Sequence, residues 1–129
     1  MTQTQTTPFQ SPAIGQEISC VMTKIDGSLL SDNKKLNLVL KNILKEEKFG
    51  ILANTMHEFS PHGCTIFFLL SESHLAIHTY PEHNSLYFSL YSCRGPKDAE
   101  ASFNKFKKIL SPKEILFFKK QKVRVAVKN

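Results

Sequence analysis

The chain has 129 residues, of which 41% are hydrophobic, and a formal net charge of +6 at pH 7. This length suffices for one domain with a modest core, and no apolar run approaches the roughly 18 residues of a membrane span, so no membrane partner is expected. Residues 1–14 are rich in Thr, Gln and Pro and lack the basic and apolar regions of a signal peptide. We therefore expect a flexible N-terminal tail over 1–14 and a single domain over 15–129.

The hydrophobic pattern predicts eight elements in the order β-α-β-β-β-β-α-β. Strands are expected over residues 17–25, 51–59, 64–71, 74–80, 85–93 and 114–127. A first helix is expected around residues 36–44 and a second over 99–110, because apolar residues recur there at helical spacing. Two helices serving several mostly antiparallel strands predict an α+β fold, a two-layer α/β sandwich with both helices on one face of the sheet.

The face of the sheet turned away from the helices is expected to carry a site or to contact a partner subunit. Residues of equal parity on a strand project to the same side. The four-residue turn at 81–84 allows the strands on either side of it to pair as a hairpin. This places a histidine, a carboxylate, a thiol and aromatic rings on one surface, from His78, Tyr80, Glu82, Ser89, Tyr91 and Cys93.

Ser73 has the opposite parity from His78. It can join that surface only if the chain bends at Glu72-Ser73, and such a bend is a plausible place for backbone strain.

The three cysteines, Cys20, Cys64 and Cys93, show no Cys-x-x-Cys spacing. An odd number argues against a disulfide framework and favours a reducing, cytoplasmic location, with Cys20 and Cys64 as core residues. His74 and His78 lie on one strand face, but their spacing is not that of a standard zinc motif, so no metal site is expected.

Positive charge is concentrated late in the chain and could attract nucleic acid. The residues are Lys105, Lys107, Lys108, Lys113, Lys119, Lys120, Lys122, Arg124 and Lys128. Because no recognised nucleic-acid-binding signature accompanies them, we expect a solvated helix face and a polar strand edge, and no nucleic-acid partner.

Three segments together resemble one known family. FLLSESHLAIHTYPE at 68–82, HEFSPHG at 57–63 and YSC at 91–93 are similar to the processing region of prokaryotic-type S-adenosylmethionine decarboxylase proenzymes, over about residues 55–95. The chain departs from the common family pattern in the first strand, in Tyr80 for a common Trp, and in Cys-Arg-Gly-Pro at 93–96 for a common Cys-Gly.

The resemblance implies that the chain cuts itself between Glu72 and Ser73 into a beta chain, 1–72, and an alpha chain, 73–129. Ser73 would become a covalent pyruvoyl cofactor, and His78 would transfer the proton during processing. The pyruvoyl ketone would form a Schiff base with the amine of S-adenosylmethionine and release CO₂. The product would be the aminopropyl donor for spermidine synthesis.

The resemblance also assigns substrate-site roles and an assembly. Cys93 would donate a proton to the product carbanion, Phe59 and Tyr80 would stack on adenine, and Glu82 would bind the ribose. Thr65 would lie near the processing site. A homodimer of processed protomers, with sites near the subunit interface, is implied.

Other functions remain open from the sequence. A homologous pyruvoyl enzyme could act on a basic amino acid, arginine or ornithine. A cysteine hydrolase using Cys93 and His78 would leave Glu72-Ser73 unexplained. A basic nucleic-acid-binding module without catalysis would bind in a strongly salt-dependent way.

Overall fold

The structure, a computed structural model, describes residues 12–126. The predicted tail lies almost wholly outside the described residues, as does residue 127 of the last predicted strand. The elements are β1 Ile14–Thr23, α1 Gly27–Leu30, α2 Asn33–Glu46, β2 Ile51–Glu58, β3 Cys64–Leu70, β4 Ser73–Tyr80, the 3₁₀ turn η1 Pro81–His83, β5 Ser85–Ser92, α3 Asp98–Leu110 and β6 Glu114–Arg124.

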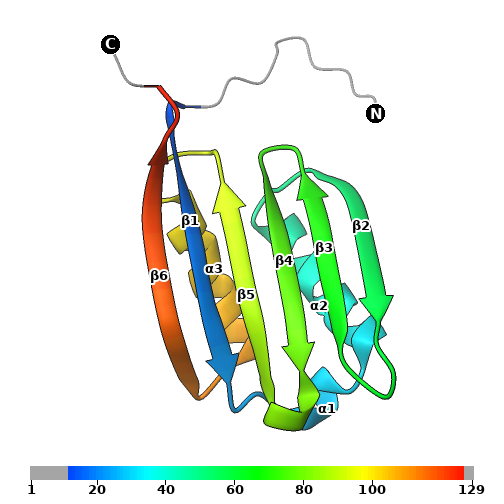
Figure 1. Cartoon of the computed structure of the whole chain (residues 1–129). Coiled ribbons are helices and arrows are strands. Elements are labelled where there is room, and N and C mark those ends of the chain that lie inside the picture. Colours follow the sequence, from blue (N-terminus) through cyan, green and yellow to red (C-terminus); the bar gives the residue numbers. More distant parts are fainter. Residues whose placement is uncertain (1–11, 127–129) are drawn as a thin grey trace.

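One six-stranded sheet in the order β2-β3-β4-β5-β1-β6 forms within the described residues. Neighbouring strands pair antiparallel throughout. Helices α2 and α3 lie against one face of this sheet, as Figure 1 shows. The predicted two-layer α+β sandwich is therefore confirmed.

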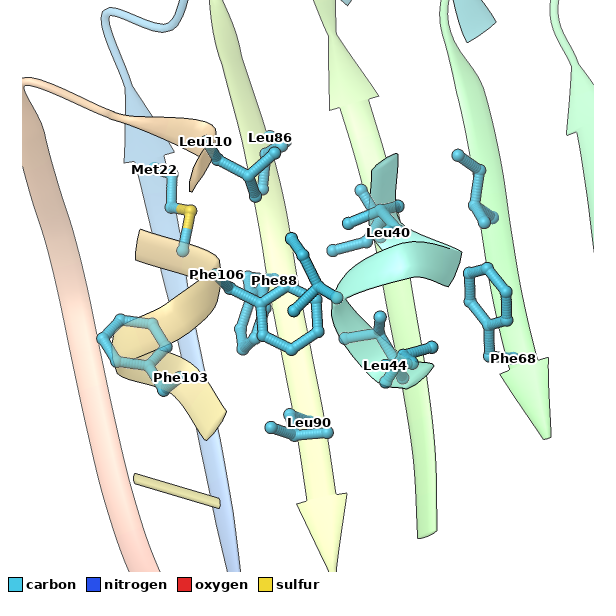
Figure 2. Close-up of a cluster of buried hydrophobic side chains, with 14 of the residues drawn as sticks. Met22, Leu40, Leu44, Phe68, Leu86, Phe88, Leu90, Phe103, Phe106 and Leu110 are labelled. Atoms are coloured by element: carbon cyan, nitrogen blue, oxygen red, sulfur yellow. The ribbon is translucent and has the colours of Figure 1, made fainter. Parts of the chain in front are cut away.

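The core fills the space between the two long helices and the sheet. Helix α2 buries Leu36, Leu40, Ile43 and Leu44, and α3 buries Ala99, Phe103, Phe106 and Leu110. These side chains meet the apolar face of the sheet, where Phe88 contacts Phe103 and Phe106 with ring centroids 5.4 and 5.2 Å apart (Figure 2). Cys20 and Cys64 are buried core residues, as predicted.

Local side-chain chemistry sets the helix ends. Asp32 caps α2 by accepting a hydrogen bond from the N–H of Lys35 at 3.1 Å. Ser111 ends α3 in the left-handed conformation, and Pro112 follows it. The sequence pattern did not predict α1, which is only four residues long and begins with a similar cap at Asp26.

Within residues 12–126, no helix lies against the opposite face of the sheet, which carries polar and aromatic side chains (Figure 1). Leu69 is 45% exposed and Tyr87 is 38% exposed on this outer face. The edge strand β6 is largely exposed and carries Lys119, Lys120 and Lys122, as the sequence predicted. Over residues 12–126, none of the helices combines the length and apolar character needed to cross a membrane.

Candidate active site

A pocket of about 280 Å³ lies where β3, β4 and the turn η1 meet. Five residues singled out in the sequence line it together: Phe59, Thr65, His78, Tyr80 and Glu82. His62, Gly63, Cys64 and Thr79 complete the wall. The antiparallel pairing of β3 with β4 brings these residues together, because it places Thr65 directly opposite His78.

The imidazole of His78 is oriented by Thr65. Its Nδ1 lies 3.0 Å from Thr65 Oγ1, and its ring centroid lies 6.1 Å from that of Tyr87 on β5. With Nδ1 engaged, Nε2 is the ring nitrogen left for proton transfer.

The aromatic side chains of the pocket are accessible to a ligand. Phe59 is 53% exposed and Tyr80 is 49% exposed. Phe59 is supported at its edge by His57, with ring centroids 4.6 Å apart. Such rings can stack on a flat ligand.

Glu82 lies at the pocket rim and is paired with His62. Oε1 of Glu82 is 3.1 Å from Nε2 of His62. The pKa of the Glu82 carboxyl lies below its usual value, chiefly because its own backbone N–H donates a hydrogen bond to it. The charges of His62 and His83 and the His62 hydrogen bond lower it further, partly offset by desolvation. The sequence did not predict that His62, in the HEFSPHG segment, pairs with Glu82.

A second cluster forms at the other end of β4, around the Glu72-Ser73 peptide bond. The backbone N–H of Cys93 donates to the carbonyl oxygen of Glu72 over 2.9 Å. The carboxylate of Glu72 accepts a longer bond, 3.4 Å, from the N–H of Gly50. The backbone bends at Ser71-Glu72, next to the predicted position.

The hydroxyl of Ser73 is buried without a hydrogen-bond partner. Among the side-chain N and O atoms of residues 12–126, only Ser73 Oγ is buried and unsatisfied. An orphaned buried hydroxyl costs about 1–3 kcal/mol, and such a group calls for an explanation. A hydroxyl without a competing partner is available to attack a neighbouring carbonyl.

Within one chain, the structure does not bring Ser73 and His78 together. They are five residues apart on an extended strand, which corresponds to about 16 Å at 3.3 Å per residue. Their side chains also point to opposite faces, since Leu75 and Ile77 share the parity of Ser73 and are buried against the helices. The site residues thus form two groups, Glu72, Ser73 and Cys93 at one end of β4 and the pocket residues at the other.

Sequence reasoning also missed a polar network beside the first group. Ser92, which pairs with Ser73 in the strand register, donates from Oγ to Asp98 Oδ2 over 2.6 Å. Arg94 donates from Nε to the same oxygen over 2.8 Å. No grouping of three or more His, Cys, Asp or Glu side chains suited to a metal ion occurs across residues 12–126.

Comparison with known proteins identifies the family. Residues 16–122 match the family described as S-adenosylmethionine decarboxylase. The chain is 36% identical over 101 residues to S-adenosylmethionine decarboxylase proenzyme 2 of Bacillus cereus, covering 78% of this chain and 82% of the relative. It is 26% identical over 110 residues to S-adenosylmethionine decarboxylase proenzyme of Picrophilus torridus, covering 85% of each.

A solved structure agrees with the sequence relatives. The crystal structure of the adenosylmethionine decarboxylase from Aquifex aeolicus VF5 superposes with a TM-score of 0.76 at 25% identity, over 91% of this chain and 94% of that one. The chain belongs to the S-adenosylmethionine decarboxylase family, as its processing-region motifs indicated.

Proposed function

We propose that this chain is a proenzyme that cuts itself between Glu72 and Ser73 and then decarboxylates S-adenosylmethionine, supplying the aminopropyl donor for spermidine synthesis. The observation that carries the proposal is the buried, unpartnered Ser73 Oγ next to a carbonyl whose oxygen already accepts the Cys93 N–H. A reducing cytoplasm suits the buried thiols of Cys20 and Cys64.

Self-cleavage begins with attack of Ser73 Oγ on the carbonyl carbon of Glu72. A C–O bond forms, the C–N bond breaks, and the hydroxyl proton passes to the freed amine, which leaves an ester. The Cys93 N–H is placed to stabilise negative charge on the carbonyl oxygen during this step.

Removal of the Ser73 α-proton then completes the cut. The electron pair of the C–H bond forms a C=C bond while the Cβ–O bond breaks, so that Glu72 leaves as a carboxylate. The resulting dehydroalanine tautomerises to an imine, and water hydrolyses it to a ketone and ammonia. The buried, unpartnered Ser73 hydroxyl fits the formation of a pyruvoyl group at this position.

A base is needed for the α-proton, and His78 of the same chain is about 16 Å away along the strand. We propose that His78 of a second copy supplies it. When two copies pack their outer sheet faces about a two-fold axis perpendicular to the strands, each β4 runs antiparallel to the other. The His78 end of one copy then meets the Ser73 end of its partner, and the reverse also holds.

The outer face is suited to such a homodimer. Leu69 and Tyr87 are apolar or aromatic side chains exposed there, at 45% and 38%. Phe67, His74 and Tyr91 form a row of neighbouring rings, with centroid separations of 6.1 and 5.9 Å. Face-to-face sheets pack about 10 Å apart, which places side chains from both copies in one layer.

The substrate would be held by residues of the pocket. Phe59 and Tyr80 would stack on the adenine and Glu82 would accept hydrogen bonds from the ribose hydroxyls, while Thr65 keeps His78 oriented. A pyruvoyl group at residue 73 would supply a carbonyl that takes up the electron pair released with CO₂. Cys93 lies beside that position and would deliver a proton to the substrate carbon.

The same geometry weakens the cysteine-hydrolase alternative. Cys93 follows β5 opposite Glu72, whereas His78 pairs with Tyr87 several residues further along the hairpin. A nucleophile and its base must lie within hydrogen-bond reach. This pair does not do so within one chain.

Intact-protein mass spectrometry tests self-cleavage. The chain should yield fragments 1–72 and 73–129, the latter beginning with a ketone, and Ser73→Ala should remain whole. An uncleaved wild-type chain that still releases CO₂ would overturn the proposal. Comparing CO₂ release from S-adenosylmethionine, arginine and ornithine tests the substrate, and preference for an amino acid would refute that part alone.

A further inference from the structure

The Glu72-Ser73 bond is held between two segments that come from distant parts of the sequence. On one side, the Cys93 N–H binds the Glu72 carbonyl. On the other side, Gly50 accepts a 2.8 Å hydrogen bond from the Ser71 N–H and donates to the Glu72 carboxylate. A Cβ atom on Gly50 would collide with the side chain of Ser71, so Gly50 and Ser71 lie in close contact. The position of the carbonyl therefore depends on the spacing between residues 49–50 and residues 92–93.

Arg94 contacts both of these segments. Its guanidinium carbon lies 3.7 Å from the centroid of the Phe49 ring, and its Nη1 donates to the carbonyl oxygen of Lys48 over 3.1 Å. Towards the other segment, its Nε donates to Asp98 Oδ2 over 2.8 Å. A planar guanidinium can stack and form directed hydrogen bonds at once, which a lysine ammonium cannot.

Asp98 closes the network around Cys93. Its Oδ2 accepts from Ser92 Oγ, and Ser92 Oγ in turn accepts from the Arg94 backbone N–H at 3.2 Å. Ser92 and Arg94, the residues before and after Cys93, thus both form hydrogen bonds to the carboxylate of Asp98. The Arg94 and Asp98 side chains are only 19% and 25% exposed, so this ion pair is less screened by water than a surface pair.

We infer that Arg94 is a positioning residue for self-cleavage: it links the Lys48-Phe49 segment to the Ser92-Cys93 segment and so keeps the Cys93 N–H on the Glu72 carbonyl oxygen. The inference rests on the proposed function and deepens it. Arg94 touches no reacting atom. It acts through the Cys93 amide, whose hydrogen bond strengthens as negative charge develops on that oxygen.

The test follows cleavage of full-length chains over time after synthesis in a cell-free system, by intact mass. Arg94→Gln should slow cleavage by about tenfold to a hundredfold, less than the 10²–10³-fold cost of removing an oxyanion donor outright. Arg94→Lys keeps the positive charge but loses the planar guanidinium that stacks on Phe49 and forms directed hydrogen bonds. Its cleavage rate should lie between those of Arg94→Gln and wild type. Lys105→Gln is the matched control, because Lys105 also forms an ion pair, at 3.1 Å with Glu46 between α3 and α2, and this partner lies outside residues 48–50 and 92–93. It should cleave at the wild-type rate.

A hydroxylamine trap separates the two steps of cleavage. Hydroxylamine attacks an ester but leaves a peptide bond intact, so when present from the end of synthesis it releases Ser73 with its hydroxyl and leaves a hydroxamate on Glu72. In a His78→Ala background, where elimination is slowed, the trapped chains accumulate at the rate of ester formation, and Arg94→Gln should lower that rate by at least severalfold. An unchanged rate of trapping would show that Arg94 does not act on the first step and would overturn the inference.

The remaining outcomes are decisive as well. Wild-type cleavage rates in Arg94→Gln, with or without a lower Tm, would show that Arg94 only anchors a loop. Equal slowing in Lys105→Gln would assign the effect to general destabilisation. Both results refute the inference and leave the proposed function standing, whereas an uncleaved wild-type chain overturns both.

Discussion

Thr65 Oγ1 lies 3.0 Å from Nδ1 of His78, across the β3-β4 pair in which these two residues are direct register partners. The sheet itself therefore sets the orientation of the imidazole. A hydrogen bond on Nδ1 fixes the ring plane, and when Thr65 accepts it from Nδ1–H, Nε2 is the ring nitrogen that can accept a proton.

Replacing Thr65 with Val removes this hydrogen bond and keeps the β-branched shape that suits a strand. We expect Thr65→Val to slow chain cleavage about tenfold, which corresponds to about 1.4 kcal/mol, the scale of one hydrogen bond. Thr65→Ser retains the hydroxyl and should cleave nearly as fast as wild type. The rates are measured from the uncut fraction over time, and equal rates for Val and Ser would refute an orienting role.

The packing of Phe106 predicts a large stability loss on truncation. Phe106 is fully buried and contacts Phe88 at the centre of the helix-sheet layer (Figure 2). Phe106→Ala should reduce the free energy of unfolding by about 3–5 kcal/mol through lost burial and the cavity left behind. Urea denaturation in a Ser73→Ala background measures this on a uniformly uncut chain. Ile109→Ala, at a 45% exposed position of the same helix, is the control and should cost much less.

Much of the fold was predictable from the sequence because its signals are local. The stripe through Leu36, Leu40 and Leu44 predicted α2, and alternation at Leu86, Phe88 and Leu90 predicted the buried face of β5. Strand order was not predictable in the same way. That β1 lies between β5 and β6 depends on long-range pairing, which no local pattern encodes.

The sequence singled out individual site residues but did not predict that they form two separate groups. Parity correctly placed Ser73 and His78 on opposite faces, and the turn at 81–84 set the hairpin. The distance between Ser73 and His78 follows from the extended conformation of the strand, however. The expectation that the site residues of one chain gather on one surface did not take this distance into account. The role of Arg94 was not predicted because its contacts reach Phe49 and Lys48, more than forty residues away in sequence.

The lowered pKa of Glu82 predicts a pH dependence of substrate binding. A carboxyl with a lowered pKa stays charged through the pH range in which a carboxyl usually takes up its proton. It loses its charge only as the pH falls through the lowered pKa. KM for S-adenosylmethionine should therefore rise only at low pH. His62→Gln removes one charge and one hydrogen bond, so the rise should begin at higher pH. The shift should be partial, since the Glu82 backbone N–H remains the main cause.

His83→Gln provides the comparison, because His83 acts on Glu82 through charge alone. In His83→Gln, the pH at which KM begins to rise should shift less than in His62→Gln. Steady-state kinetics of the cleaved enzyme across acidic pH measure both. Identical profiles in wild type and His62→Gln would show that Glu82 does not govern the acidic limb.

The separation of Ser73 from His78 predicts complementation between two defective chains. Ser73→Ala keeps His78 but has no hydroxyl to attack, and His78→Ala keeps Ser73 but has no base to offer. Each should cleave poorly or not at all when made alone. Made together in equal amounts, about half of the His78→Ala chains should pair with a Ser73→Ala partner in a two-fold dimer and be cut. Mass spectrometry distinguishes the chains, since every 73–129 fragment that appears should carry the His78→Ala substitution. If the mixture stays as uncut as the separate variants, then each site draws Ser73 and His78 from one chain, and β4 must rearrange to bring them together.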